Sequence, residues 1–116
     1  MARRSRAYQI LTDAADLIEQ NGLAKETFVR RDDGVVAYCA IGALRMAAYG
    51  SMIGWRSYSR AGGRWRSYSR AVQALAAAVG VKATAGAWSP IADWNDRKRT
   101  KASTVVFKLR EAAATV

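Results

Sequence analysis

The residues best suited to chemistry form a duplicated basic and aromatic segment near the middle of the chain. The hexapeptide Trp-Arg-Ser-Tyr-Ser-Arg occurs at 55–60 and again, letter for letter, at 65–70. Arginine side chains bind phosphate oxygens, and the faces of Trp and Tyr stack on exposed bases at about 1–3 kcal/mol per base. We therefore take this segment and the basic run at 97–99 as a candidate site for nucleic acid or an acidic protein partner. The candidate residues are Trp55, Arg56, Tyr58, Arg60, Arg64, Trp65, Arg66, Arg70, Arg97, Lys98 and Arg99.

The same residues also have a purely structural interpretation. Trp65 and Tyr68 have the spacing of core anchors on a helix, and the arginines would then form its solvated face. The basic clusters at 3–6 and 97–101 are each more typical of solubilising charge than of a binding site. They would add phosphate contacts only if the fold brought them onto one face.

Composition limits the classes of function. The 116 residues contain 19 Lys and Arg against 9 Asp and Glu, a net charge of +10 that favours acidic partners. There is no histidine and a single cysteine, Cys39, so the chain has no intramolecular disulfide, no His-activated nucleophile and no His ligand for zinc. A cysteine on an apolar helix is usually buried and inert. We expect a non-enzymatic protein without catalytic residues, metal or cofactor.

Nothing in the sequence predicts insertion into a membrane. The most apolar stretch, 40–55, is interrupted by Arg45, and no run approaches the ~18 apolar residues that a span needs. The basic N-terminus is followed by Gln9 and Asp13 rather than by the apolar core of a signal peptide. These features predict a cytoplasmic protein, in the host cytoplasm if a phage encodes it.

Hydrophobic periodicity predicts a single mainly α domain over 1–116, with about four helices around a central apolar helix and a small β-hairpin after the first helix. The helices are expected at 3–20, 37–49 and 65–79, with a last helix capped by Thr100 or Ser103. The hairpin is expected at 27–36 around Asp32-Asp33-Gly34. A basic loop or insert is expected at about 51–66. Gly42 lowers helix propensity in the central helix, which predicts that another backbone crosses it closely.

A short helical turn is expected from Ser89-Pro90 to Trp94, followed by Asn95 and Asp96. These last two side chains could form a polar ligand site. The favoured interpretation is a core tryptophan followed by capping and turn residues, because Asn and Asp bond their own backbone in turns. An enzyme built on Asp93 and Asp96 would require both carboxylates in a cleft.

Two motifs resemble those of a known group of proteins. The Cys39-Ala-Ile-Gly-Ala-Leu44 helix after a hairpin, and the late Trp94-Asn95-Asp96 before a final helix, resemble a family of short uncharacterised actinobacterial and actinophage proteins. The resemblance covers most of the chain except 51–64 and implies this fold without an established activity. We therefore expect a small basic accessory protein, encoded by a phage, that binds DNA or RNA with little sequence specificity. The alternative is an effector that docks on an acidic face of a host protein and modulates it.

Overall fold

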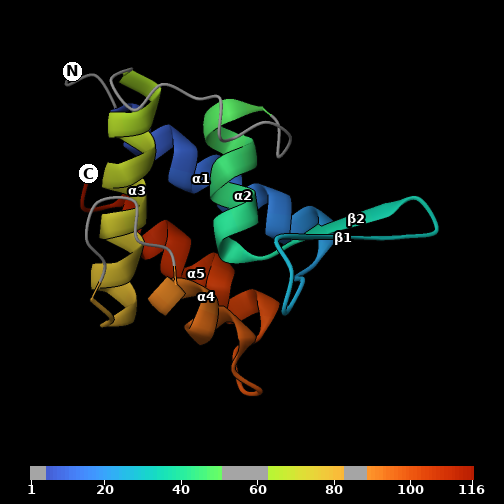
Figure 1. Ribbon diagram of the computed structural model, residues 1–116. Helices are drawn as coiled ribbons and strands as arrows, with labels where there is room; N and C mark the ends of the chain where they lie inside the picture. The colour runs from blue at the N-terminus through green and yellow to red at the C-terminus, as the bar shows by residue number, and fades with distance from the viewer. Residues whose placement is uncertain (1–4, 51–62, 83–88) are drawn as a thin grey trace.

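The computed structural model describes residues 5–50, 63–82 and 89–116, and within these ranges it contains five helices and a two-stranded sheet (Figure 1). The mainly α class and the hairpin after the first helix are confirmed. The fifth helix is the segment expected to be a short turn. In chain order the elements are α1 (Arg6–Asn21), β1 (Val29–Asp32), β2 (Val35–Tyr38), α2 (Ala40–Tyr49), α3 (Gly63–Val79), α4 (Ser89–Asp96) and α5 (Ala102–Ala113).

Helix α1 begins later than its apolar pattern predicts, because Ser5 provides the N-cap. The Ser5 hydroxyl accepts a hydrogen bond from the backbone N–H of Tyr8, 3.1 Å away. Gly22 ends the helix with a φ of +94°, as expected for a glycine after the last turn. The buried face contains Ala7, Ile10, Leu11, Ala14, Ala15 and Ile18.

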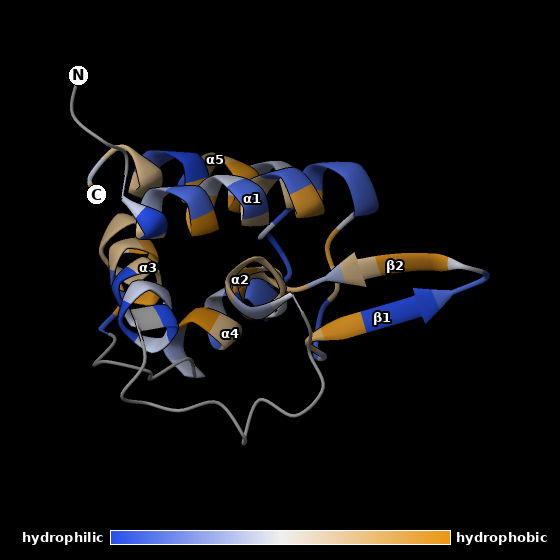
Figure 2. Cartoon of the chain, turned by 90° about the horizontal axis from the view of Figure 1, so that it is seen from above, coloured by the Kyte–Doolittle hydropathy of each residue, from blue (hydrophilic) through white to orange (hydrophobic). Residues whose placement is uncertain are grey.

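The hairpin is confirmed, but it lies two residues further along the chain than predicted. Val29 pairs with Tyr38 and Asp32 pairs with Val35, so Asp33 and Gly34 form a two-residue turn. Their φ values are +47° and +81°, the left-handed conformation that this tight turn requires. The hairpin projects from one side of the helical body, with α3 on the opposite side (Figures 1 and 2).

Helix α2 is the central helix that the sequence predicts. Its residues from Ala40 to Arg45 are all buried, and it contacts α1, α3 and α4. It begins three residues later than expected because Ala37 and Tyr38 belong to β2 and Cys39 is the N-cap. The expected close approach at Gly42 is confirmed, since a Cβ there would lie 2.0 Å from the carbonyl oxygen of Phe28.

Helices α1 and α5 lie side by side and pack more extensively than any other pair of elements in the described part of the chain (Figure 2). The predicted apolar stripe of α5 is confirmed, with Val105, Val106, Leu109, Ala112 and Ala113 all buried. The predicted cap is wrong. Lys101 occupies the N-cap position without a side-chain hydrogen bond.

The hydroxyl of Thr100 does not bind a backbone N–H of α5, as a helix cap would. It donates to the carbonyl of Trp94, 2.8 Å away, and so fastens the loop between α4 and α5. None of the helices in residues 5–50, 63–82 and 89–116 is long and apolar enough to cross a lipid bilayer.

Candidate nucleic-acid interface

The second copy of the repeat occupies the first turns of α3, as its apolar continuation predicts. At 100° per residue, Arg66, Arg70, Gln73 and Ala77 follow one line along the helix, and all four are exposed. We call these four residues the α3 stripe. Arg64 is also exposed, but it lies in the first turn and on a different side of the helix.

The aromatic residues of this copy turn toward the core. Tyr68 is only 3% exposed, and Trp65 is half-buried with its ring 5.9 Å from that of Tyr68. The Tyr68 hydroxyl accepts a hydrogen bond from Nε of Arg45, 3.3 Å away. Burial raises the pKa of Tyr68 above its ordinary value, against the lowering effect of Arg45. The structural interpretation of Tyr68 as a core anchor is therefore confirmed.

Four of the candidate residues lie outside the described part of the chain. These are Trp55, Arg56, Tyr58 and Arg60, which belong to the first copy of the repeat. The described candidates are therefore the residues of α3 and the basic run at 97–99.

The basic run at 97–99 is exposed, but it does not join the arginines of α3. It lies in the loop between α4 and α5, at the opposite end of the molecule from the beginning of α3 (Figure 1). Lys25 is held against this loop, because its Nζ donates to the carbonyl of Arg97. The structure thus divides the predicted site into two separate basic regions.

Acidic residues are absent from the middle of the sequence, so α3 has positive charge only. No Asp or Glu occurs between Asp33 and Asp93, so α2 and α3 contain no acid at all. Among the described residues, Arg64, Arg66 and Arg70 make no ion pair. Uncompensated guanidinium groups on an exposed helix attract polyanions.

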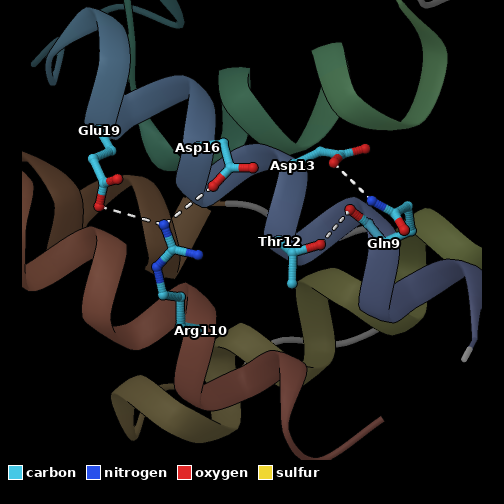
Figure 3. A network of polar contacts seen from close by, with 6 residues as sticks. All are labelled: Gln9, Thr12, Asp13, Asp16, Glu19 and Arg110. Atoms are coloured by element: carbon cyan, nitrogen blue, oxygen red, sulfur yellow. Dashed lines mark hydrogen bonds and ion pairs between the residues drawn. The ribbon is translucent and has the colours of Figure 1, made fainter.

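The acids of α1 have partners elsewhere. Arg110 of α5 contacts Asp16 at 3.1 Å and Glu19 at 3.3 Å, and the neighbouring Gln9 donates to Asp13 at 2.8 Å (Figure 3). The contacts of Arg110 join α1 to α5. The acids of the described chain therefore leave the positive charge of α3 uncompensated.

Asn95 has a structural role that sequence reasoning missed. Its side chain is fully buried; Oδ1 accepts from the N–H of Ala40 at 2.8 Å, and Nδ2 donates to the carbonyl of Ala24 at 3.0 Å. The expectation that Asn95 bonds the backbone of its own turn is wrong. It caps α2 through Ala40, 55 positions away in the sequence, and fixes the segment after α1 through Ala24, 71 positions away. Only its place directly after a core tryptophan hinted at burial.

Asp96 makes the same kind of remote contact from the end of α4. Its Oδ1 accepts from the backbone N–H of Glu26 at 2.8 Å and from Nδ2 of Asn95 at 3.1 Å. Glu26 has a φ of +64°, so this hydrogen bond helps to hold a residue in a left-handed conformation. The Trp94-Asn95-Asp96 motif thus joins α4 to both ends of the hairpin region.

The two sequence motifs meet at a cavity of about 350 Å³ beside this junction. Its lining includes Phe28, Cys39, Ala92 and Asp96. Burial raises the pKa of the Cys39 thiol, and hydrogen bonds to the N–H groups of Gly42 and Ile41 oppose the rise. The thiol is therefore protonated at neutral pH and is a poor nucleophile. Asp93 is exposed and does not line this cavity, so the two carboxylates of α4 are not paired in it.

Comparisons with known proteins give one family. A family model described as "Family of unknown function (DUF6197)" matches residues 2–115. No curated protein and no solved structure matches the chain. The matched range contains every helix and strand described above, including the hairpin, the central helix after it and the Trp94-Asn95-Asp96 junction. The chain therefore belongs to the family of unknown function DUF6197.

Proposed function

We propose that this protein is a small basic, non-enzymatic accessory protein that binds nucleic acid with little sequence specificity, and that α3 supplies part of the binding surface. The observation that carries the proposal is the run of exposed arginines on α3, with no acidic partner among the described residues. Arginines in this setting bind phosphates, which every nucleotide sequence presents alike.

The absence of acids from α2 and α3 supports the proposal further. A positive surface with an acidic neighbour would be neutralised within a Debye length of ~8 Å at physiological salt. The acids nearest in sequence to α3 are Asp33 and Asp93, and they belong to the hairpin turn and to α4. The arginines of α3 therefore have no acid on their own helix to offset their charge, and uncompensated positive charge attracts polyanions.

Weak, general binding fits the size of this surface. Arg66 and Arg70 give two phosphate contacts, which raise the affinity by roughly 30-fold at 0.15 M salt at a slope of 0.9 per contact. The basic run at 97–99 lies at the opposite end of the molecule from the beginning of α3 (Figure 1). It contributes to the overall charge that attracts a polyanion.

The experiment is fluorescence anisotropy of a labelled 20-base-pair DNA between 0.05 and 0.3 M salt. The test variant is Arg66→Ala with Arg70→Ala. The matched control is Arg30→Ala with Arg31→Ala, which removes the same charge from exposed positions on β1. We expect the logarithm of the affinity to fall linearly with the logarithm of the salt concentration, with a slope shallower by about 1.8 in the test variant, at 0.9 per phosphate contact.

The control variant should keep the wild-type slope to within about 0.5. Equal losses in the two variants would show that only total charge matters, and no binding at 0.05 M salt would refute the proposal. That result would instead favour the alternative function, an effector that docks on an acidic face of a host protein through the same arginines.

The chain is rich in Arg and Ala, and its two motifs resemble those of short actinobacterial and actinophage proteins. We therefore propose an actinobacterial or actinophage origin and action in the host cytoplasm.

A further inference from the structure

We infer that the α3 stripe is a phosphate-binding surface for double-stranded nucleic acid rather than a stacking site for single strands. This inference rests on the proposed function and names the form of nucleic acid that the described surface fits. Three observations support it: the direction of the aromatic side chains, the arrangement of the arginines, and the place of α3 in the fold.

The aromatic side chains of α3 face the core rather than solvent: Tyr68 is buried and Trp65 is half-buried against it. Single-strand sites combine a basic groove with exposed aromatic faces, on which successive bases stack. On α3 the ring of Tyr68 is buried and its hydroxyl accepts a hydrogen bond from Nε of Arg45, while the Trp65 ring packs on Tyr68. The α3 stripe itself, from Arg66 to Ala77, contains no aromatic residue. It can therefore contact phosphates but cannot hold unstacked bases.

The stripe instead presents charge and hydrogen-bond donors in a line. Arg66 and Arg70 are four residues apart, which is about 6 Å along the helix axis, so their long side chains reach neighbouring phosphates of one strand. Gln73 continues the line one turn further, with its Nε2 3.2 Å from the Ser69 hydroxyl. A duplex carries a charge every ~1.7 Å of its axis, against ~3.4 Å for each strand. A surface that reads only phosphate charge therefore favours the duplex.

The position of α3 allows a rigid duplex to approach it. The helix lies at the edge of the molecule opposite the hairpin, in both views (Figures 1 and 2). The α3 stripe from Arg66 to Ala77 spans about 16 Å along the helix axis, which is a straight line along which a duplex backbone can lie. Lys82 is exposed just beyond the C-terminal end of α3 and adds a positive charge there.

The test compares four labelled probes of 20 nucleotides or base pairs: duplex DNA, duplex RNA, oligo-dT and oligo-U. Anisotropy is measured with the wild-type protein, with the Arg66→Ala and Arg70→Ala double variant, and with Trp65→Phe. The last change removes an indole but keeps an aromatic ring against Tyr68. Circular dichroism and a urea titration of each variant establish that it is folded.

We expect the duplexes to bind at least 5-fold more tightly than the single strands at 0.15 M salt. The double variant should lose roughly 30-fold on duplexes, which is the loss of two contacts of slope 0.9 at that salt concentration. Trp65→Phe should leave every affinity within 2-fold. Preference between the two duplexes then distinguishes DNA from RNA as the natural ligand.

Tighter binding to oligo-dT or oligo-U, with a loss of 5-fold or more in Trp65→Phe, would overturn the inference while leaving the proposed function intact. Duplex binding that the double variant does not weaken would also overturn it, because the site would then lie elsewhere. Failure to bind any of the four probes at 0.05 M salt would instead refute the proposed function itself.

Discussion

The carbonyl of Phe28 is pressed against Gly42, so closely that a Cβ on Gly42 would lie 2.0 Å from the oxygen. The same carbonyl accepts a hydrogen bond from the N–H of Cys39 at 3.1 Å. The segment before β1 is therefore fixed directly against the first turn of α2. A side chain at Gly42 would have to displace the backbone of Phe28, because the atoms that it would meet belong to the main chain and not to a flexible side chain.

Gly42→Ala tests this contact through the sign of its effect. In a helix without the contact, replacing Gly by Ala stabilises by about 1 kcal/mol. Here we expect a loss of roughly 3 kcal/mol, because overpacking against backbone forces the elements apart. Urea unfolding followed by circular dichroism measures the difference, and Ala47→Gly in the same helix is the control, with an expected loss of about 1 kcal/mol. Any gain in stability from Gly42→Ala would contradict the contact.

Asn95→Ala should be among the most destabilising single changes at a polar position. It leaves the N–H of Ala40 and the carbonyl of Ala24 without their buried partner, at about 1–3 kcal/mol for each group. Asn21→Ala serves as the comparison, because its half-buried side chain donates only to the Leu17 carbonyl of the same helix. Thermal and urea unfolding should show a larger loss of folding free energy in Asn95→Ala than in Asn21→Ala. Equal losses would mean that water replaces the remote contacts of Asn95.

Arg110→Ala should have a small effect that depends on salt. The side chain is exposed, and exposed ion pairs contribute at most about 1 kcal/mol, so the contacts with Asp16 and Glu19 add little (Figure 3). Unfolding measured at 0.05 and 0.5 M salt should show the deficit shrinking as the charges are screened. Lys108→Ala, which breaks a contact within α5, is the control. A deficit that persists in high salt would assign the loss to packing of the arginine stem.

Alkaline pH should destabilise the fold through two buried groups. Burial raises the pKa of Cys39 above its ordinary 9.0 and the pKa of Tyr68 above its ordinary 10.0. Above these values the unfolded chain releases protons that the folded chain retains, so the unfolded state is favoured as pH rises. The contribution of Cys39 is complete below about pH 9 and that of Tyr68 below about pH 10, and each is lost as the pH rises above that value.

The variant Cys39→Ser isolates the thiol. Serine keeps the capping acceptor for the N–H of Gly42 but does not titrate in this range. We expect urea midpoints between pH 8 and 10 to fall less steeply with pH in this variant than in the wild type. Parallel curves would show that the thiol of the folded protein titrates at its ordinary pKa.

Much of the fold follows from local pattern, as α5 illustrates. The spacing of Val105, Val106 and Leu109 can be satisfied only by a helix with one buried face, and the structure buries all three. The turn at Asp33-Gly34 is equally local, since few residues other than these accept two successive positive φ values. Such features require no knowledge of the rest of the chain.

The contacts that hold the elements together could not be predicted in this way. Asn95 is a turn residue by type, and only the packed fold brings Ala40 and Ala24 within reach of its amide. Thr100 is a capping residue by type, yet its hydroxyl donates to Trp94 instead. The α3 stripe lies between these cases. Its place on a helix and the core position of Tyr68 follow from the spacing, whereas the hydrogen bond from Arg45 to the Tyr68 hydroxyl depends on how α2 and α3 pack.

The pairing of α1 with α5 also governs how the chain behaves while it is being made. Roughly 80 residues separate the end of α1 from the start of α5, and synthesis at about 5–20 residues per second takes roughly 4–16 s to cover them. During that interval the apolar face of α1 lacks the helix with which it packs most extensively in the described part of the chain. A nascent chain, or a message truncated before α5, would therefore present that face to chaperones and proteases. Burial of the α1 face therefore waits for the synthesis of α5.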